Sequence, residues 1–355
     1  MGQTNKLEIR VSPSPHVSKA LSTRSVMIDV LIGLAPALAA AVYYFRVHAV
    51  TLVAVCVASC AAAEWVCNRI RRRANTLGDF SAVVTGVILA FSLPPALPWW
   101  AAMVGGCVAI GIGKMVFGGL GSNVFNPAMV GRTFMAASLG TLMTTWTVPA
   151  TVDPVMPKVA PQRLDARTQA TPLAWSKTAI KNELGATTYN RQIFGSTVTG
   201  EVGGCLGETS AVALALGGLY LLIRRTINWR IPAGVLGAAF VFAAAAFVLD
   251  GDVVSEPSRQ WLASETYVQP LFHLTSGAML LCAFFIATDP VTMPLTGRGM
   301  WIFAVGVGIL TMLIRVVGEY PEGVMYAILL MNGATPLIDR FCKVIPVGGK
   351  PGGKG

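Results

Sequence analysis

The sequence predicts an all-α integral membrane protein with about ten transmembrane helices, arranged as two inverted repeats of about five helices each, with broken helices. Three observations support this fold class. Hydrophobic residues make up 54% of the 355 residues and charged residues only 12%, which is far from the composition of a soluble domain. Continuous apolar runs of about 17 to 25 residues recur along the chain. Basic residues gather at the ends of these runs, as they do in membrane proteins of fixed orientation.

The apolar runs give the expected helices in order. In the first half they cover 26–45, 50–67, 80–97, 99–117 and 127–145, and in the second half 208–223, 232–249, 271–288, 300–317 and 323–338. Helices are favoured because lipid offers the backbone no other hydrogen-bond partner, and because a membrane barrel would show alternating segments. The first run is interpreted as a retained helix, since no cleavage site of small residues follows it.

Basic residues predict that both termini are cytoplasmic. Lys6, Arg10, Lys19 and Arg24 precede the first run, and Arg69, Arg71, Arg72 and Arg73 follow the second. A count of ten spans also places the later basic residues on the cytoplasmic side, namely Lys114, Arg132, Arg224, Arg225, Arg230, Arg298, Arg340, Lys343, Lys350 and Lys354. The net charge of +10 is therefore explained by basic residues that set the orientation of the chain in the membrane. Nucleic-acid binding is not expected.

This orientation divides the chain into five parts. Residues 1–24 form a cytoplasmic segment, 25–145 the first repeat, 146–207 an external loop, 208–338 the second repeat with an external loop at 250–270, and 339–355 a cytoplasmic tail. The two repeats share matched prolines. "LAFSLPPALP" (89–98) contains Pro94 and Pro98, and "FFIATDPVTMP" (284–294) contains Pro290 and Pro294 at the same spacing. An odd number of helices in each half requires the second copy to be inverted.

Two further glycine- and proline-containing segments are candidate helix breaks. These are "GGLGSNVFNPA" (118–128) and "GEYPEG" (318–323), and each has a plain turn as its alternative interpretation. Asn126 precedes Pro127, which disfavours helix at this asparagine and suits it to capping the helix that follows.

Three ionisable residues are candidates for ion coupling. Lys114 and Arg315 occupy matched positions near span ends, and Asp289 precedes Pro290 in a predicted broken helix. A charged group at membrane depth is a functional candidate, while snorkelling to the interface is the alternative for the two cations. No metal site is predicted, because the three histidines are scattered and no second cluster accompanies the cysteines of the second run.

The segment "LDARTQATPLAW" (164–175) is a polar, threonine-containing part of the predicted external loop. A threonine hydroxyl in an exposed segment is an accessible acceptor for a phosphoester. The alternative is an ordinary solvated loop.

Longer stretches resemble a known family. "SPSPHVSKALSTRSVMIDVLIGLAPALAAAVYYF", "GGLGSNVFNPAMVGRTF", "TQATPL", "LTSGAMLLCAFFIATDPVTMPLTGRG" and "YPEGVMYAILLMNGATPLIDRF" together resemble the RnfD subunits of Rnf electron-transport complexes over about residues 11–343. The NqrB subunit of the sodium-translocating NADH:quinone reductase is similar but has an N-terminal extension, so the Rnf assignment is favoured. A channel or transporter without redox function is the alternative from another class.

The resemblance implies a cofactor and partners. In the family's D-x-x-[ST]-x-A-T pattern, a threonine carries covalent FMN; here the pattern is Asp165, Thr168, Ala170 and Thr171, with Gln169 where glycine is common, so Thr171 is the expected acceptor. A second, noncovalent flavin such as riboflavin is also expected. The resemblance further implies a flavin transferase and other Rnf subunits, including a second FMN-bearing one. It implies electron transfer from ferredoxin to NAD⁺, coupled to Na⁺ or H⁺ movement across a bacterial inner membrane.

Overall fold

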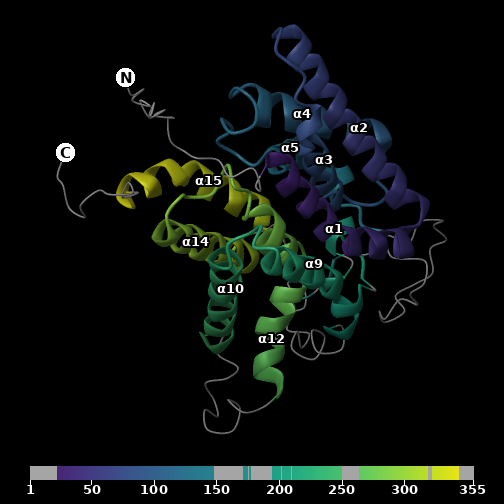
Figure 1. The fold of residues 1–355 in the computed structure, drawn as a ribbon. Helices are drawn as coiled ribbons and strands as arrows, with labels where there is room; N and C mark the ends of the chain where they lie inside the picture. The colour runs from purple at the N-terminus through teal and green to yellow at the C-terminus, as the bar shows by residue number, and fades with distance from the viewer. Residues whose placement is uncertain are drawn as a thin grey trace, which may run out of the picture.

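The computed structural model describes residues 22–147, 171–174, 176, 194–200, 202–208, 210–249, 264–318 and 322–343. The secondary-structure elements of these residues are helices. Figure 1 shows α2, α3, α4 and α5 together on one side and α10, α12, α14 and α15 on the other, with α1 and α9 between them. The helices of the first and second halves of the chain thus form two groups that meet at α1 and α9 and also at α5 and α15.

Three helices in the described part of the chain are long and apolar enough to cross a membrane. They are α1 (Thr23–Phe45), α2 (Val47–Ile70) and α14 (Gly297–Val316). Further apolar helices accompany them: the shorter α3 (Ser81–Phe91), α4 (Trp99–Ile110) and α9 (Ala211–Ile223), and α10 (Arg230–Leu249), whose apolar part covers Arg230–Ala246. The remaining helices are α5 (Pro127–Ser138), α6 (Gly140–Met143), α12 (Ser264–Thr275), α13 (Met279–Leu281) and α15 (Val324–Phe341). The described residues thus confirm the predicted all-α fold class with helices that can cross a membrane.

The predicted span 80–97 is longer than the helix that forms. Helix α3 ends at Phe91, and the chain then turns, with the Leu97 amide donating to the Pro94 carbonyl at 3.1 Å. The cause is the proline pair, since a proline cannot donate and its ring disfavours helix in the residue before it. Pro98 then precedes the first turn of α4.

The predicted span 271–288 is also interrupted. Helix α12 ends at Thr275, and Gly277 adopts a φ of +69°, in the left-handed region that glycine tolerates. Helix α13 follows and continues into a π-helical turn, Cys282–Ile286. Since α4 likewise continues into a π-helical turn, Gly111–Met115, both halves contain a helix with a π-helical end.

The segment "GGLGSNVFNPA" connects two helices and does not break one. Gly118, Gly119 and Gly121 have positive φ angles of 128°, 112° and 90°, which form a turn after the π-helical segment. The Asn126 Oδ1 accepts from the Met129 amide at 3.3 Å, and Pro127 occupies the first helical position of α5. The predicted cap is confirmed. Of "GEYPEG", residues 319–321 lie outside the described residues.

Helices α1 and α9 approach each other through glycines. A Cβ built on Gly217 would lie 1.9 Å from the Gly33 carbonyl oxygen, so only a hydrogen fits between the two backbones. Small residues at such crossings allow close van der Waals packing, which is a main source of helix association in membranes. This contact joins the N-terminal helix of the first half to the first helix of the second half.

Gly217→Ala should therefore destabilise the protein by about 1 to 3 kcal/mol, because α1 and α9 must separate to admit the methyl group. Thermal unfolding of the detergent-purified chain measures this. Gly237→Ala is the control, since a Cβ at Gly237 meets nothing within 4 Å. Equal unfolding midpoints for the two variants would contradict the packing described here.

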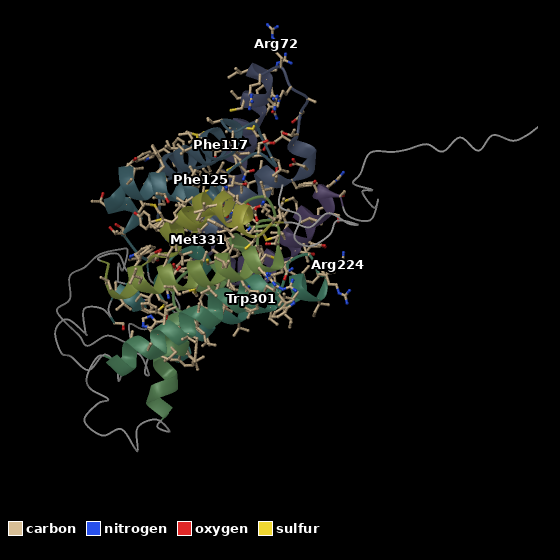
Figure 2. All side chains as sticks on the ribbon, turned by 90° about the vertical axis from the view of Figure 1, so that its left-hand side faces the viewer. Arg72, Phe117, Phe125, Arg224, Trp301 and Met331 are labelled. Atoms are coloured by element: carbon tan, nitrogen blue, oxygen red, sulfur yellow. The ribbon has the colours of Figure 1, made fainter. Side chains whose placement is uncertain are left out.

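The two ends of α1 face different groups. At its N-terminal end, Asp29 accepts from Thr226 at 3.0 Å and pairs with the exposed Arg224 at 3.4 Å. At its C-terminal end, the Tyr44 hydroxyl donates to the Thr199 carbonyl at 3.0 Å. A helix of this length separates the two ends by about 30 Å. Arg224 therefore lies far from Thr199, and Figure 2 shows Arg72 and Arg224 pointing away from the helices.

Candidate functional site

A cavity lies between the two groups of helices, at the interrupted segments. Its walls come from α1, α3, the π-helical turn after α4, the start of α5 and residues 285–290. Lys114 and Asp289 both line it, so the structure brings together two of the three predicted ion-coupling residues. Polar side chains of the same wall include Ser81, Thr85, Asn123, Asn126, Thr226 and Thr288.

Asp289 caps the turn that follows the second interruption. Its Oδ1 accepts from the Val291 amide at 3.2 Å, and its Oδ2 accepts from the Thr292 hydroxyl at 3.2 Å. These bonds orient the carboxyl group at the cavity wall. Asn123, in the first half of the chain, has a buried Oδ1 with no hydrogen-bond partner among the described residues. The cavity thus offers a carboxylate and an amide oxygen, two of the oxygen ligands that small hard cations prefer.

Lys114 forms a buried ion pair. Its Nζ lies 2.8 Å from Glu64 Oε2 and 2.6 Å from Ser81 Oγ, and its side chain is 2% exposed. Thr76 donates to the other Glu64 oxygen and accepts from Asn68 Nδ2 at 2.8 Å. Snorkelling of Lys114 is therefore wrong: the amine is turned inward by a carboxylate that is fully buried on α2.

Arg315 is buried too, at a different place. Its Nη1 donates to the His273 carbonyl at 2.6 Å and its Nη2 to the Ser276 carbonyl at 3.1 Å. These carbonyls belong to the break between α12 and α13, where helical partners are missing. Arg315 holds this break together and does not line the cavity of Lys114 and Asp289. Snorkelling is wrong for this residue as well.

Thr171 lies in a packed segment. Its side chain is 1% exposed, and its Oγ1 accepts from the Ala174 amide at 3.2 Å at the start of a short helical turn, 172–174. Leu173 packs with Val202 and Phe272. The prediction that this hydroxyl is exposed is thus wrong, because the segment packs against the end of α12. Asp165, Thr168, Gln169 and Ala170 lie outside the described residues.

The same segment approaches Arg315. A Cβ on Gly277 would lie 2.8 Å from Leu173 Cδ1 and 2.9 Å from Arg315 Nη2, so both side chains pack on the Gly277 turn. The predicted flavin acceptor and one predicted ion-coupling residue therefore belong to one region. Sequence spacing gave no sign of this proximity.

Sequence reasoning also missed a second buried ion pair. Arg132 was expected among the inner basic residues, but it is 3% exposed and pairs with Glu322. Cys205 and Glu208 complete a group whose sulfur and carboxylate oxygen ligand atoms, with those of Glu322, lie within 4.8 Å of one another. A basic residue near a predicted span end can equally well be interfacial or buried, so only the fold reveals this group.

Comparison with known proteins decides between the families. The model of the NQR2, RnfD, RnfE family matches residues 10–348, which is nearly the whole chain. The chain belongs to this family. It is similar to the D subunit of the Na⁺-translocating ferredoxin:NAD⁺ oxidoreductase complex of Acetobacterium woodii, with 44% identity over 96% of this chain and 95% of the relative.

Two further relatives have related names. The D subunit of the proton-translocating ferredoxin:NAD⁺ oxidoreductase complex of Clostridium ljungdahlii is 37% identical over 98% of both chains. The D subunit of an ion-translocating oxidoreductase complex of Halorhodospira halophila is 39% identical over 93% of this chain and 92% of the relative. The resemblance to RnfD subunits is thereby confirmed, and the names of the relatives include both sodium and proton translocation.

Proposed function

We propose that this chain is the membrane-embedded RnfD subunit of an Rnf-type complex that transfers electrons from ferredoxin to NAD⁺ and couples this transfer to movement of Na⁺ or H⁺. The similarity to the D subunit of the Acetobacterium woodii complex carries the proposal, because it covers nearly all of both chains. The ten-helix inverted repeat, with both termini cytoplasmic and the Thr171 segment outside a bacterial inner membrane, is part of it. The separation of Arg224 from Thr199, at opposite ends of α1, supports this orientation.

Within this function, Thr171 is the acceptor of covalent FMN, attached through its phosphate. The described residues fit such a group: the hydroxyl is held at the start of a turn, and the cationic Arg315 packs on the same Gly277 turn as Leu173. A cation near a phosphoester offsets its negative charge. Bound FMN supplies the redox chemistry, and the protein positions it and adjusts its electrostatic surroundings.

The burial of Thr171 adds an order of events to this proposal. A transferase cannot reach a hydroxyl that is 1% exposed, so attachment precedes packing of this segment onto α12, or the segment must open. A flavin transferase acting outside the membrane meets the chain in that open form. The other Rnf subunits, including the second FMN-bearing one, and a noncovalent flavin such as riboflavin complete the proposed assembly.

The cavity is the proposed site of ion coupling. Asp289 follows the interruption in the second half, and Lys114 lies at the π-helical turn of the first half, so both halves contribute a charge to one space. Interrupted helices at a repeat interface are typical places for coupling ions in transporters. Arg315 contributes to ion coupling indirectly, because it stabilises the break between α12 and α13 near the Thr171 segment.

Asp289→Asn should uncouple ion movement from electron flow. The amide keeps the turn, since its oxygen can still accept from Val291, but it removes the negative charge that a cation needs. In membrane vesicles containing the complex, reduction of NAD⁺ by reduced ferredoxin should persist while ²²Na⁺ uptake or internal acidification falls at least about tenfold, as expected for loss of about 1.4 kcal/mol or more of ion binding.

Asp29→Asn is the matched control. The cavity is lined by the N-terminal part of α1, and Asp29 lies in that part of the helix but does not line the cavity. Retention of coupling in Asp289→Asn would refute the proposed ion site. Reduction of quinone in place of NAD⁺ by the wild-type complex would refute the Rnf function itself.

A further inference from the structure

Four ionisable side chains meet at a place that the proposed function does not use. Arg132 extends from α5, Cys205 and Glu208 lie in the turn before α9, and Glu322 lies just before α15. All four are less than 9% exposed. The group therefore joins the first half of the chain to two segments of the second half in a closed environment.

The contacts within the group are specific. Arg132 Nη2 donates to Glu322 Oε2 and lies 3.5 Å from Cys205 Sγ. The Cys205 amide donates to Glu208 Oε2 at 3.3 Å, and its thiol donates to the Ser92 carbonyl at 3.2 Å. The sulfur also lies 4.0 Å from Glu322 Oε1. Of the two carboxyl groups, Glu322 pairs with the Arg132 guanidinium, whereas Glu208 is held by the Cys205 amide.

One oxygen in this group lacks a donor. Glu208 Oε1 is buried and has no hydrogen-bond partner among the described residues. A buried carboxylate oxygen without a donor is costly, and two carboxylates this close strongly disfavour ionisation of both. A single proton between the two carboxyl groups removes one charge and supplies the missing hydrogen bond.

The nearby charged groups do not replace that proton. Arg315 is close enough for its charge to act on Glu208 and Glu322. Its Nη1 and Nη2 atoms, however, donate to the carbonyls of His273 and Ser276. The Cys282 thiol faces Arg315 in turn and is buried. The donor that Glu208 Oε1 needs is therefore not visible on these side chains.

We propose that Glu208 and Glu322 hold one exchangeable proton between them, in a site closed by Arg132 and Cys205. A sodium ion fits less well, because it needs about six oxygen ligands and one of the atoms nearest the carboxylates is a sulfur. A divalent transition metal would require the thiolate, whereas this thiol is hydrogen-bonded to Ser92. The proposal is independent of the flavin at Thr171 and of the cavity at Asp289.

The site has a built-in competition. Arg132 pairs with Glu322 when that carboxyl is ionised, which leaves the proton on Glu208. Loss of the proton from Glu208 places a second negative charge next to the Arg132–Glu322 pair, within range of the charge of Arg315. Since Arg132 and Glu322 belong to different halves of the chain, the protonation of Glu208 changes the balance of charge across the contact between them.

Infrared difference spectroscopy of the purified complex tests the proposal. At neutral pH in sodium-free buffer, the wild type should show the C=O stretch of a protonated carboxyl group, and this band should shift in D₂O. Glu208→Gln should remove the band while the unfolding midpoint stays near the wild-type value, because the amide supplies a donor to Glu322. Asp29→Asn should leave the band unchanged.

A second measurement needs no variant. Dicyclohexylcarbodiimide reacts with protonated carboxyl groups in apolar surroundings, and mass spectrometry after digestion should find the adduct on Glu208 or Glu322 of the wild-type chain. Absence of both the infrared band and the adduct would overturn the proposal. A stoichiometric metal ion in the purified complex, or a band that persists in both Glu208→Gln and Glu322→Gln, would overturn it equally.

Discussion

Thr171→Ala is expected to abolish covalent flavin on the chain. After co-expression with a flavin transferase, in-gel fluorescence of the denatured wild-type chain should reveal bound flavin, and the variant should show none. The physical reason is the loss of the only atom of this residue that can form a phosphoester, its Oγ1. Electron transfer from ferredoxin to NAD⁺ by the complex should fall to background, since the proposed relay would then lack a carrier.

Thr178→Ala is the matched control, because it removes a hydroxyl of the same loop that lies outside the D-x-x-[ST]-x-A-T pattern. It should keep the fluorescence. Thr171→Ser should keep the signal as well, since it retains the Oγ. Fluorescence that survives Thr171→Ala would show that another hydroxyl is the acceptor, and no fluorescence in the wild type would favour the channel alternative.

Lys114→Met is expected to give the largest loss of stability. It leaves Glu64, which is fully buried, with a charge and no cation. Removing one partner of a buried ion pair costs about 3 to 5 kcal/mol, because the remaining charge is uncompensated in a medium of low dielectric constant. Fluorescence-detected size-exclusion chromatography after heating should show a correspondingly lower unfolding midpoint.

Two variants separate this effect from general damage. The double variant Lys114→Met with Glu64→Gln removes both charges and should regain most of the lost stability. Arg224→Met breaks a pair in which the arginine is 57% exposed, so it should change stability by less than about 1 kcal/mol. A double variant as unstable as Lys114→Met alone would mean that the amine acts through Ser81 or the packing of its alkyl chain, and not through the ion pair.

The sequence predicted the membrane class and the places of interruption well, because both depend on local composition. The matched prolines do lie between helical segments, with 94 and 98 between α3 and α4 and 290 and 294 between the turn 282–286 and α14, and Asn126 does cap α5. Helix extents were predicted less well. Apolar runs continue through the turns at 92–98 and 276–278, so hydropathy could not show that α3 ends at Phe91 or that α12 ends at Thr275.

The site was predicted only as separate residues. Lys114 and its partner Glu64 are 50 positions apart, and Arg132 and Glu322 are 190 apart, so neither pair has a sequence signal. The packing of the Thr171 segment next to Arg315 depends on how α12 breaks at Gly277. These contacts are long-range, and they follow from helix packing that a single sequence does not specify.

An aromatic surface remains for partner or lipid contact in the assembled complex. Phe117 and Phe125 lie 6.2 Å apart in an edge-to-face arrangement, and Figure 2 shows them above Met331. With Leu329 and Leu330 of α15, the two phenylalanines line an apolar hollow. Such a surface is expected on a chain that is surrounded by hydrocarbon.

Peptide mapping by tandem mass spectrometry tests the proposed flavin attachment most directly. Trypsin should release residues 168–177, "TQATPLAWSK", which contain both candidate hydroxyls. In the chain matured with a flavin transferase, we expect this peptide to carry the mass of FMN less one water, with the fragment ions placing it on Thr171. An unmodified peptide, or fragments that place the added mass on Thr168 or Ser176, would contradict attachment at Thr171.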